Sequence, residues 1–140
     1  MIPDLQMSVI CDDVRQERNG KFILIGLFDV VNLPSFPGIF GRVCIVNRWC
    51  CGQGEFTEQT RIVAPDNGPV AAEGKPITVQ LQHPEFTATN VEFFINVKFD
   101  KEGVYWVEIL LNGHMKLRYP LRVIQVKPPK PSSAEGPTLA

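Results

Sequence analysis

The sequence predicts an all-β protein, an antiparallel β-sandwich of about eight strands. Two observations predict this class. Apolar and polar side chains alternate through residues 103–111, stop at Asn112-Gly113, and alternate again through residues 115–123. An Asn-Gly pair between two such segments is the strongest short signal for a β-hairpin, because both residues tolerate a positive φ. The rest of the chain has turn residues at spacings typical of short strands, and no stretch keeps the apolar period of a helix.

Length and composition indicate one globular domain. The chain has 140 residues, of which 44% are hydrophobic and 21% charged, so it is large enough to bury a core without a disulfide or a metal. Its 14 basic and 15 acidic residues are spread along the chain and give a net charge of −1. Such a balance argues against a nucleic-acid partner.

The N-terminal residues indicate a cytoplasmic protein. Met1–Gln6 has neither the basic nor the apolar segment of a signal peptide, and no apolar run approaches the roughly 18 residues of a membrane span. We therefore expect no membrane partner. The four cysteines are expected to stay reduced, since structural disulfides are rare in the cytoplasm.

Four strands are expected in the first half of the chain. Alternation through residues 5–12 predicts the first strand, and Asn19-Gly20 predicts a turn after it. Residues 21–31 form a nearly continuous apolar run, which is typical of a central strand covered on both faces. Residues 42–51 and 56–64 are expected to be the third and fourth strands.

A loop, Asn32–Phe40, is expected between the second and third strands, because Pro34 and Pro37 remove backbone donors and fix φ. The loop is unusually apolar and carries Phe36 and Phe40. Two interpretations stay open: the loop folds back over one end of the core, or it presents an apolar contact surface.

The second half of the chain continues the sandwich to residue 126. After a turn at residues 65–68 we expect an edge piece at 70–72, strands at 77–81 and 91–99, and then the final hairpin. Residues 127–140 contain four prolines and no aromatic residue, which predicts a disordered tail. Pro128-x-x-Pro131 fits the spacing read by proline-recognition modules, and a merely solubilising tail is the alternative.

The segment Asp100-x-x-Gly103-x-Tyr105-x-Val107 resembles the tyrosine corner of immunoglobulin-like domains. In antibody domains the second residue after the tyrosine is a disulfide cysteine, and here that residue is Val107. The resemblance therefore implies an immunoglobulin-like sandwich that lacks the disulfide between the sheets.

Over residues 5–126 the chain also resembles a family of small bacterial proteins of unknown function. The matching features are Val9–Asp13, Leu24–Asp29 and the step Gly103-x-Tyr105 into the final hairpin. This resemblance implies a single all-β domain from a bacterium. It implies no activity and no site residues.

Outward-facing aromatic side chains are the candidates for a binding surface. Trp106 has the opposite parity to Tyr105, so it is expected on the other face of its strand together with Leu110. Phe94 is expected to face outward on a neighbouring strand and to complete one apolar patch. That patch is covered by the Asn32–Phe40 loop, by a second copy of the chain, or by another protein or ligand. The candidate partner-binding residues are Trp106, Phe94, Leu110, Phe36 and Phe40.

No residue cluster predicts catalysis, a cofactor or a metal site. Cys50-Cys51 is the one unusual dipeptide, and it lacks the Cys-x2-Cys spacing of a zinc site. His83 and His114 lie in expected turns, and no motif links either of them to a cysteine or serine nucleophile.

These observations favour a non-catalytic protein-interaction module that binds a partner protein or associates with itself as a homo-oligomer. Two alternatives stay open. One is a module that binds a carbohydrate or another small ligand through exposed aromatic side chains. The other is a thiol-dependent enzyme that uses Cys50 or Cys51.

Overall fold

The computed structural model of the protein describes residues 1–127, which form ten β-strands and no helix. The all-β prediction is confirmed, with more strands than the eight or so that were expected. No segment of the described chain is a helix that could span a membrane. The tail expected from residue 127 onward lies outside the described residues, apart from Lys127 itself. The strands are β1 Asp4–Gln16, β2 Phe22–Leu27, β3 Val30–Leu33, β4 Gly38–Cys50, β5 Gly54–Val63, β6 Val70–Glu73, β7 Ile77–Leu81, β8 Ala88–Phe99, β9 Gly103–Leu111 and β10 His114–Gln125.

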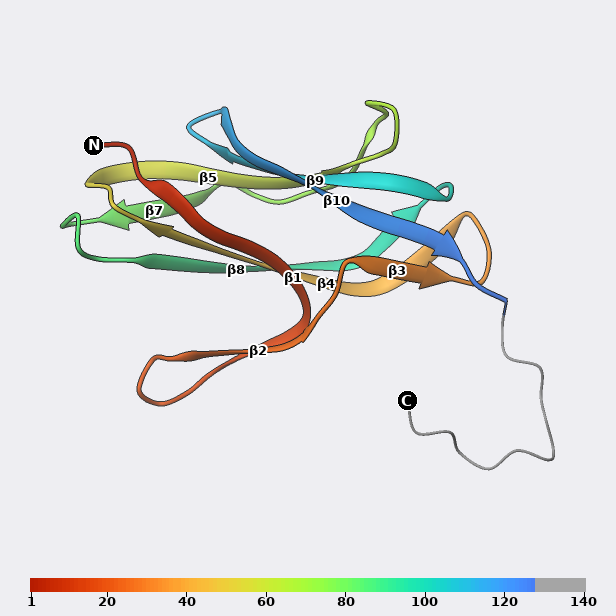
Figure 1. Ribbon diagram of the computed structural model, residues 1–140, viewed down its shortest axis with the longest axis horizontal. Coiled ribbons are helices and arrows are strands. Elements are labelled where there is room, and N and C mark those ends of the chain that lie inside the picture. Colours follow the sequence, from red (N-terminus) through yellow and green to blue (C-terminus); the bar gives the residue numbers. More distant parts are fainter. Residues whose placement is uncertain (128–140) are drawn as a thin grey trace.

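The strands form two sheets that lie face to face (Figure 1). Sheet A has the order β2-β1-β4-β8, and all its neighbours are antiparallel. Sheet B has the order β3-β10-β9-β5-β6, and β7 also pairs with β5. Since β3 and β10 are parallel, the sandwich is not antiparallel throughout as predicted. β3 and β10 are connected by residues 34–113, which contain β4 to β9, and a parallel pair needs such a long connection because a tight hairpin can join only antiparallel strands.

One hydrophobic core lies between the two sheets. Trp49 of sheet A and Tyr105 of sheet B are among its largest fully buried side chains. The ring of Phe99 packs edge-on against that of Tyr105, with centroids 4.9 Å apart and planes at 88°. Full burial of one such side chain stabilises the fold by about 1.5–3 kcal/mol. This core therefore lies on the inner faces of the two sheets.

The final hairpin has the predicted turn. Asn112 and Gly113 have φ values of 49° and 80°, and positive φ at both central residues is what a tight hairpin turn requires. Met115 lies opposite Leu110, and a register shift between Met115 and Leu117 then places Leu117 opposite Ile109. The predicted alternation therefore holds only after this shift.

The prediction of one central strand over residues 21–31 is wrong. The apolar run divides at Asp29: β2 pairs only with β1 at the edge of sheet A, whereas Val31 belongs to β3 in sheet B. Val31 is fully buried, but Ile25 is 40% exposed and Leu27 is 62% exposed. The continuous run suggested one covered strand because apolar content alone does not show which sheet each half joins.

The predicted Asn32–Phe40 loop is shorter in the structure. β3 extends to Leu33 and β4 begins at Gly38, so only residues 34–37 lie outside the strands. Phe36 and Phe40 are half-buried and pack against the main core. The structure thus agrees with the first interpretation, in which this segment folds over one end of the core.

Candidate functional site

β1 takes part in two different pairings along its length. Its first part, Asp4 to Cys11, pairs with β4, and its second part, Cys11 to Gln16, pairs with β2. The second part and β2 form a hairpin that extends beyond sheet A, on the side away from sheet B (Figure 1). The Asn19-Gly20 turn that closes it was predicted from the sequence, and Gly20 has the positive φ, 89°, that suits a glycine.

A small second apolar cluster fixes the hairpin to the outer face of sheet A. Cys11, Cys44 and Val46 are fully buried there, and Val14 and Leu24 of the hairpin pack against them. The two cysteines have no exposed surface because they lie between sheet A and the hairpin. The hairpin therefore forms a third, partial layer of the molecule.

An ion pair adds to this attachment. The guanidinium of Arg42 on β4 contacts the carboxylate of Asp13 in the hairpin. The same guanidinium stacks on the ring of Phe93, 4.5 Å from its centroid. Both contacts are partly exposed to water, so each contributes only modestly to the stability of the fold.

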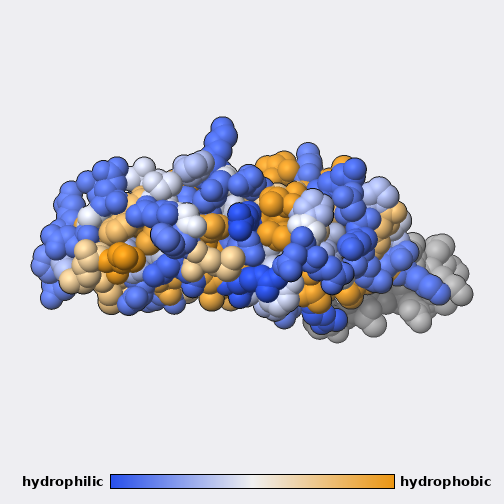
Figure 2. All heavy atoms as spheres, turned by 90° about the horizontal axis from the view of Figure 1, so that it is seen from above, coloured by the Kyte–Doolittle hydropathy of each residue, from blue (hydrophilic) through white to orange (hydrophobic). Residues whose placement is uncertain are grey.

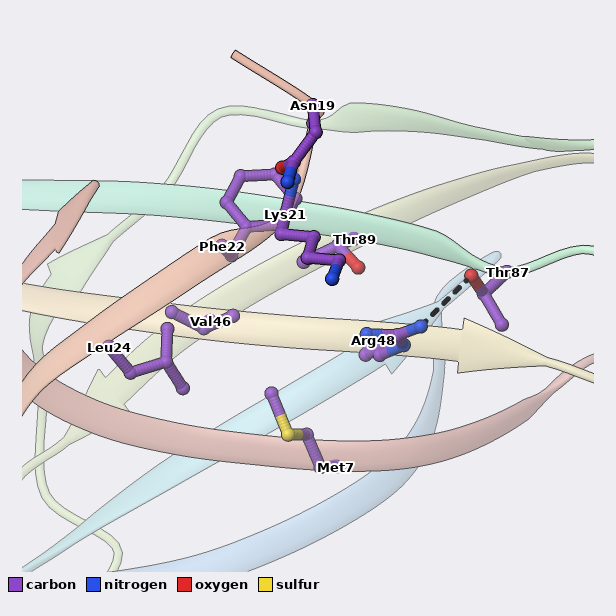
Figure 3. A pocket seen from close by; sticks show the side chains of 10 residues that line it. Met7, Asn19, Lys21, Phe22, Leu24, Val46, Arg48, Thr87 and Thr89 are labelled. Carbon is purple, nitrogen blue, oxygen red and sulfur yellow. Dashed lines mark hydrogen bonds between the residues drawn. The ribbon is translucent and has the colours of Figure 1, made fainter. Parts of the chain in front are cut away.

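A cleft lies between the hairpin and the outer face of sheet A (Figure 3). Its volume is about 640 Å³, within the range of small-molecule sites. The hairpin contributes one wall, and β1, β4 and the start of β8 contribute the other. The lining residues are Met7, Asn19, Gly20, Lys21, Phe22, Leu24, Val46, Arg48, Thr87 and Thr89.

The charge of the cleft is positive. Lys21 and Arg48 line it and no acidic residue does, and neither cation forms an ion pair with any residue in the described range 1–127. The Nη2 of Arg48 donates a 3.3 Å hydrogen bond to the Oγ1 of Thr87. The Nε of Arg48 is buried and has no acceptor among the described residues.

The hairpin also exposes an apolar strand edge. β2 has the sequence Phe-Ile-Leu-Ile-Gly-Leu and pairs on one side only, with β1. Its exposed fractions are 37% for Phe22, 43% for Ile23, 40% for Ile25 and 62% for Leu27. An open edge with unpaired backbone groups and apolar side chains is a template for another strand.

The expected patch of Trp106, Leu110 and Phe94 does not form. Trp106 and Leu110 are half-buried on the outer face of sheet B, whereas Phe94 lies on β8 of sheet A and is buried in the core. β8 and β9 follow each other in sequence but belong to different sheets. In addition, Asn96 has a positive φ of 54°, and this local irregularity changes which side chains of β8 face inward.

Trp106 lies in a mixed polar and apolar setting instead. The guanidinium of Arg118 stacks 3.9 Å from the centre of the Trp106 ring. Glu108 lies between Trp106 and Leu110 on β9. Its carboxylate forms ion pairs with the guanidinium of Arg61 at 2.6 Å and with that of Arg118 at 3.3 Å. Figure 2 views the molecule from this side and shows apolar groups set among hydrophilic side chains. This face is therefore less apolar than the sequence suggested.

Two acidic side chains occupy the space between the sheets. Glu58 is fully buried and receives hydrogen bonds from the Trp49 Nε1 at 2.5 Å and the Asn90 Nδ2 at 3.4 Å. Burial raises the pKa of Glu58 above its ordinary value, although these hydrogen bonds oppose the rise. Burial, followed by the nearby Glu58 carboxylate, raises the pKa of Glu92 to about 7. Sequence reasoning missed this pair, because both residues lie in strands with alternating polar and apolar positions, where an acidic side chain normally faces water.

The cysteines and histidines do not form a reactive group in the described chain. All four cysteines are free, and no three His, Cys, Asp or Glu side chains of residues 1–127 come together around a metal-sized space. Burial raises the pKa of the Cys44 thiol to about 12. The neighbouring Cys51 thiol, followed by burial, raises the pKa of Cys50. His83 accepts a hydrogen bond from the backbone of Glu85 at 3.1 Å, within its own turn.

The chain belongs to DUF6941, a family of unknown function, whose sequence model matches residues 6–124. This agrees with the resemblance to a family of unknown function. No curated protein matches the chain. Among the solved structures that match is Pseudomonas fluorescens alkylpurine DNA glycosylase AlkC bound to DNA containing an abasic site analog, with 12% identity and a TM-score of 0.47. That match covers 83% of this chain and 30% of the glycosylase chain, so this chain spans less than a third of that protein.

Proposed function

We propose that this member of the DUF6941 family is a non-catalytic binding module that recognises a partner protein along the open edge of β2. The observation that carries the proposal is the exposed, uncharged strand Phe22–Leu27. Edge strands of natural proteins are usually protected by charged residues or prolines. β2 contains neither, so its edge is suited to binding.

The proposed occupant is an extended segment of another protein that adds to β2 as a further strand. Such strand addition takes its affinity from main-chain hydrogen bonds and its specificity from alternate side chains. Ile23 and Ile25 are at alternate positions of β2 and offer apolar contacts. Lys21 and Asp29 flank the strand at opposite ends. A segment with an acidic residue at one end and a basic residue at the other would complement both charges.

A thiol-dependent enzyme has less support than a binding module. A catalytic cysteine needs a lowered pKa, so that the thiolate forms near neutral pH. The pKa values of Cys11 and Cys44 are raised by burial, and that of Cys50 is raised first by its hydrogen bond with Cys51. Four free thiols suit the cytoplasm, which is where we place the module.

The test compares the full-length chain with two single variants in affinity capture from a lysate of the native host. Ile25→Lys places a charge on the β2 edge, and Val70→Lys places the same charge on β6, an exposed position of the other sheet. Both side chains are exposed, so both variants are expected to keep the fold. We expect a protein that is retained by the wild type and by Val70→Lys and is lost from Ile25→Lys.

Two results would overturn the proposal. One is a partner that binds both variants as well as the wild type, because the β2 edge would then not be the contact. The other is recovery of a second copy of the chain alone, with the native mass of Ile25→Lys falling to that of a monomer, because β2 would then serve self-association.

A further inference from the structure

We infer that the cleft between the hairpin and sheet A is a second binding site. Its ligand is a small organic anion that has an apolar body and one carboxylate or phosphate group. This inference can fail or hold separately from the proposed protein contact. The two sites share Lys21 and Phe22, but the cleft lies between the hairpin and sheet A, whereas the proposed contact uses the open edge of β2, where Ile25 does not line the cleft.

The anionic part of the ligand follows from the two cations. Lys21 comes from the turn end of the hairpin and Arg48 from β4, so segments 27 residues apart in sequence supply positive charge to one space. Each has no carboxylate partner within residues 1–127. The chain as a whole has a net charge of −1, but this opening is lined by two unpaired cations and by no acidic residue, so its local charge is positive. Such an opening attracts an anion.

The Arg48 side chain is partly prepared for such a ligand. Its Nη2 bond to Thr87 restrains the guanidinium, and its buried Nε lacks an acceptor among the described residues. A carboxylate or phosphate oxygen in the cleft would bond the terminal nitrogens of this guanidinium, because the guanidinium fork suits both groups.

The apolar part of the ligand follows from the rest of the lining. Met7, Leu24 and Val46 form an apolar wall, and Phe22 is exposed at the hairpin side. The hydroxyl-bearing Thr87 and Thr89 lie near Arg48 (Figure 3). Apolar walls with a few convergent polar groups are the usual construction of a small-molecule site.

The test uses a pair of fluorescent probes that differ only in charge. Anilinonaphthalene sulfonate has an apolar body and an anionic group, and phenylnaphthylamine has the same rings without the sulfonate. We expect Arg48→Gln to weaken binding of the sulfonate probe about 10-fold or more, since a charged hydrogen bond is lost. Lys21→Gln, a change at an exposed position, is expected to weaken it several-fold. Both variants are expected to bind the uncharged probe as the wild type does.

Two control variants define the site. Lys116→Gln removes an exposed cation on β10, outside the cleft, and is expected to leave both probes unaffected. Ile25→Lys blocks the β2 edge and is also expected to leave them unaffected, so failure of the protein-binding proposal would not be confused with failure of this one. Displacement of the sulfonate probe by phenyl phosphate or by benzoate then shows which anionic group the cleft prefers.

Three outcomes would overturn the inference. They are sulfonate binding that is unchanged in both Lys21→Gln and Arg48→Gln, an equal loss of both probes in Lys21→Gln, and a loss in Lys116→Gln as large as that in Lys21→Gln. The Lys21 variant keeps the test decisive if Arg48→Gln unfolds.

Discussion

The indole Nε1 of Trp49 donates a 2.5 Å hydrogen bond to the Oε1 of Glu58, and both side chains are fully buried. The bond joins β4 of sheet A to β5 of sheet B through the middle of the sandwich. Among the described residues, Glu58 has no cationic partner, and its Oε2 accepts no hydrogen bond. The Trp49 donor is therefore the main compensation for burying this carboxyl group.

Replacing Trp49 tests this dependence. Trp49→Phe leaves Glu58 without its closest donor, and an unsatisfied buried group costs about 1–3 kcal/mol in addition to the lost packing. We expect its free energy of unfolding, measured by urea denaturation, to fall by at least about 2 kcal/mol. Trp106→Phe, on the half-buried outer face of sheet B, is the matched control and is expected to cost less than half as much. Equal losses would contradict the role assigned to the bond.

The raised pKa of Glu92 leads us to expect an unusual pH dependence of the protein's stability. The folded protein keeps the Glu92 proton up to its pKa of about 7, whereas an unfolded chain releases it near the ordinary value of 4.5. Between these values the folded state binds more protons, so stability falls as the pH rises. The raised pKa of Glu58 acts in the same direction.

Glu92→Gln removes this contribution. We compare the free energies of unfolding of the variant and the wild type, measured by urea denaturation at pH 4.5 and pH 8. The difference in favour of the variant is expected to grow by at least about 1 kcal/mol over this range, since one pKa unit corresponds to about 1.4 kcal/mol. Curves of stability against pH that run parallel for variant and wild type would show that Glu92 titrates normally.

The thiols are predicted to react in two classes. Cys51 is exposed and Cys50 is half-buried at the end of β4, while Cys11 and Cys44 are buried under the hairpin, where burial raises their pKa values. Alkylation of the native protein near neutral pH is therefore expected to modify Cys51 first and to spare Cys11 and Cys44. All four should react in denaturant. Fast alkylation of Cys50 below pH 7 would instead favour the thiol-dependent enzyme.

The Tyr105 hydroxyl offers a further stability test. It donates a 2.8 Å hydrogen bond to the carbonyl of Lys101, four residues earlier, and so fixes the turn between β8 and β9. Tyr105→Phe keeps the ring contact with Phe99 and removes only this bond. We expect a loss of about 1 kcal/mol in the free energy of unfolding. A change below about 0.3 kcal/mol would show that water replaces the bond at no cost.

The parts of the fold that sequence reasoning predicted well are those in which local signals agree. The final hairpin combines alternation over most of its length with Asn112-Gly113, and the positive φ values at that turn are a purely local property. The turn at Asn19-Gly20 was found in the same way. Each needs only neighbouring residues for its definition.

The predictions that failed depend on contacts between distant segments. The run of residues 21–31 is apolar throughout, but only the partners of β2 and β3 decide that one half is exposed and the other is buried. The patch containing Phe94 failed because β8 and β9 lie in different sheets. The cleft was missed altogether, since no sequence pattern links Lys21 with Arg48 before the hairpin is placed beneath sheet A.

Amide hydrogen exchange of β2, with and without the captured partner, tests the central claim most directly. The outward amides of residues 22–27 pair with nothing in the described chain beyond β1, so in the complex we expect them to exchange at least about 10-fold more slowly, because they then bond to an added strand. The amides of β6, another edge strand of the molecule, are expected to be unchanged. Protection elsewhere, with β2 exchanging as it does in the free protein, would contradict the account.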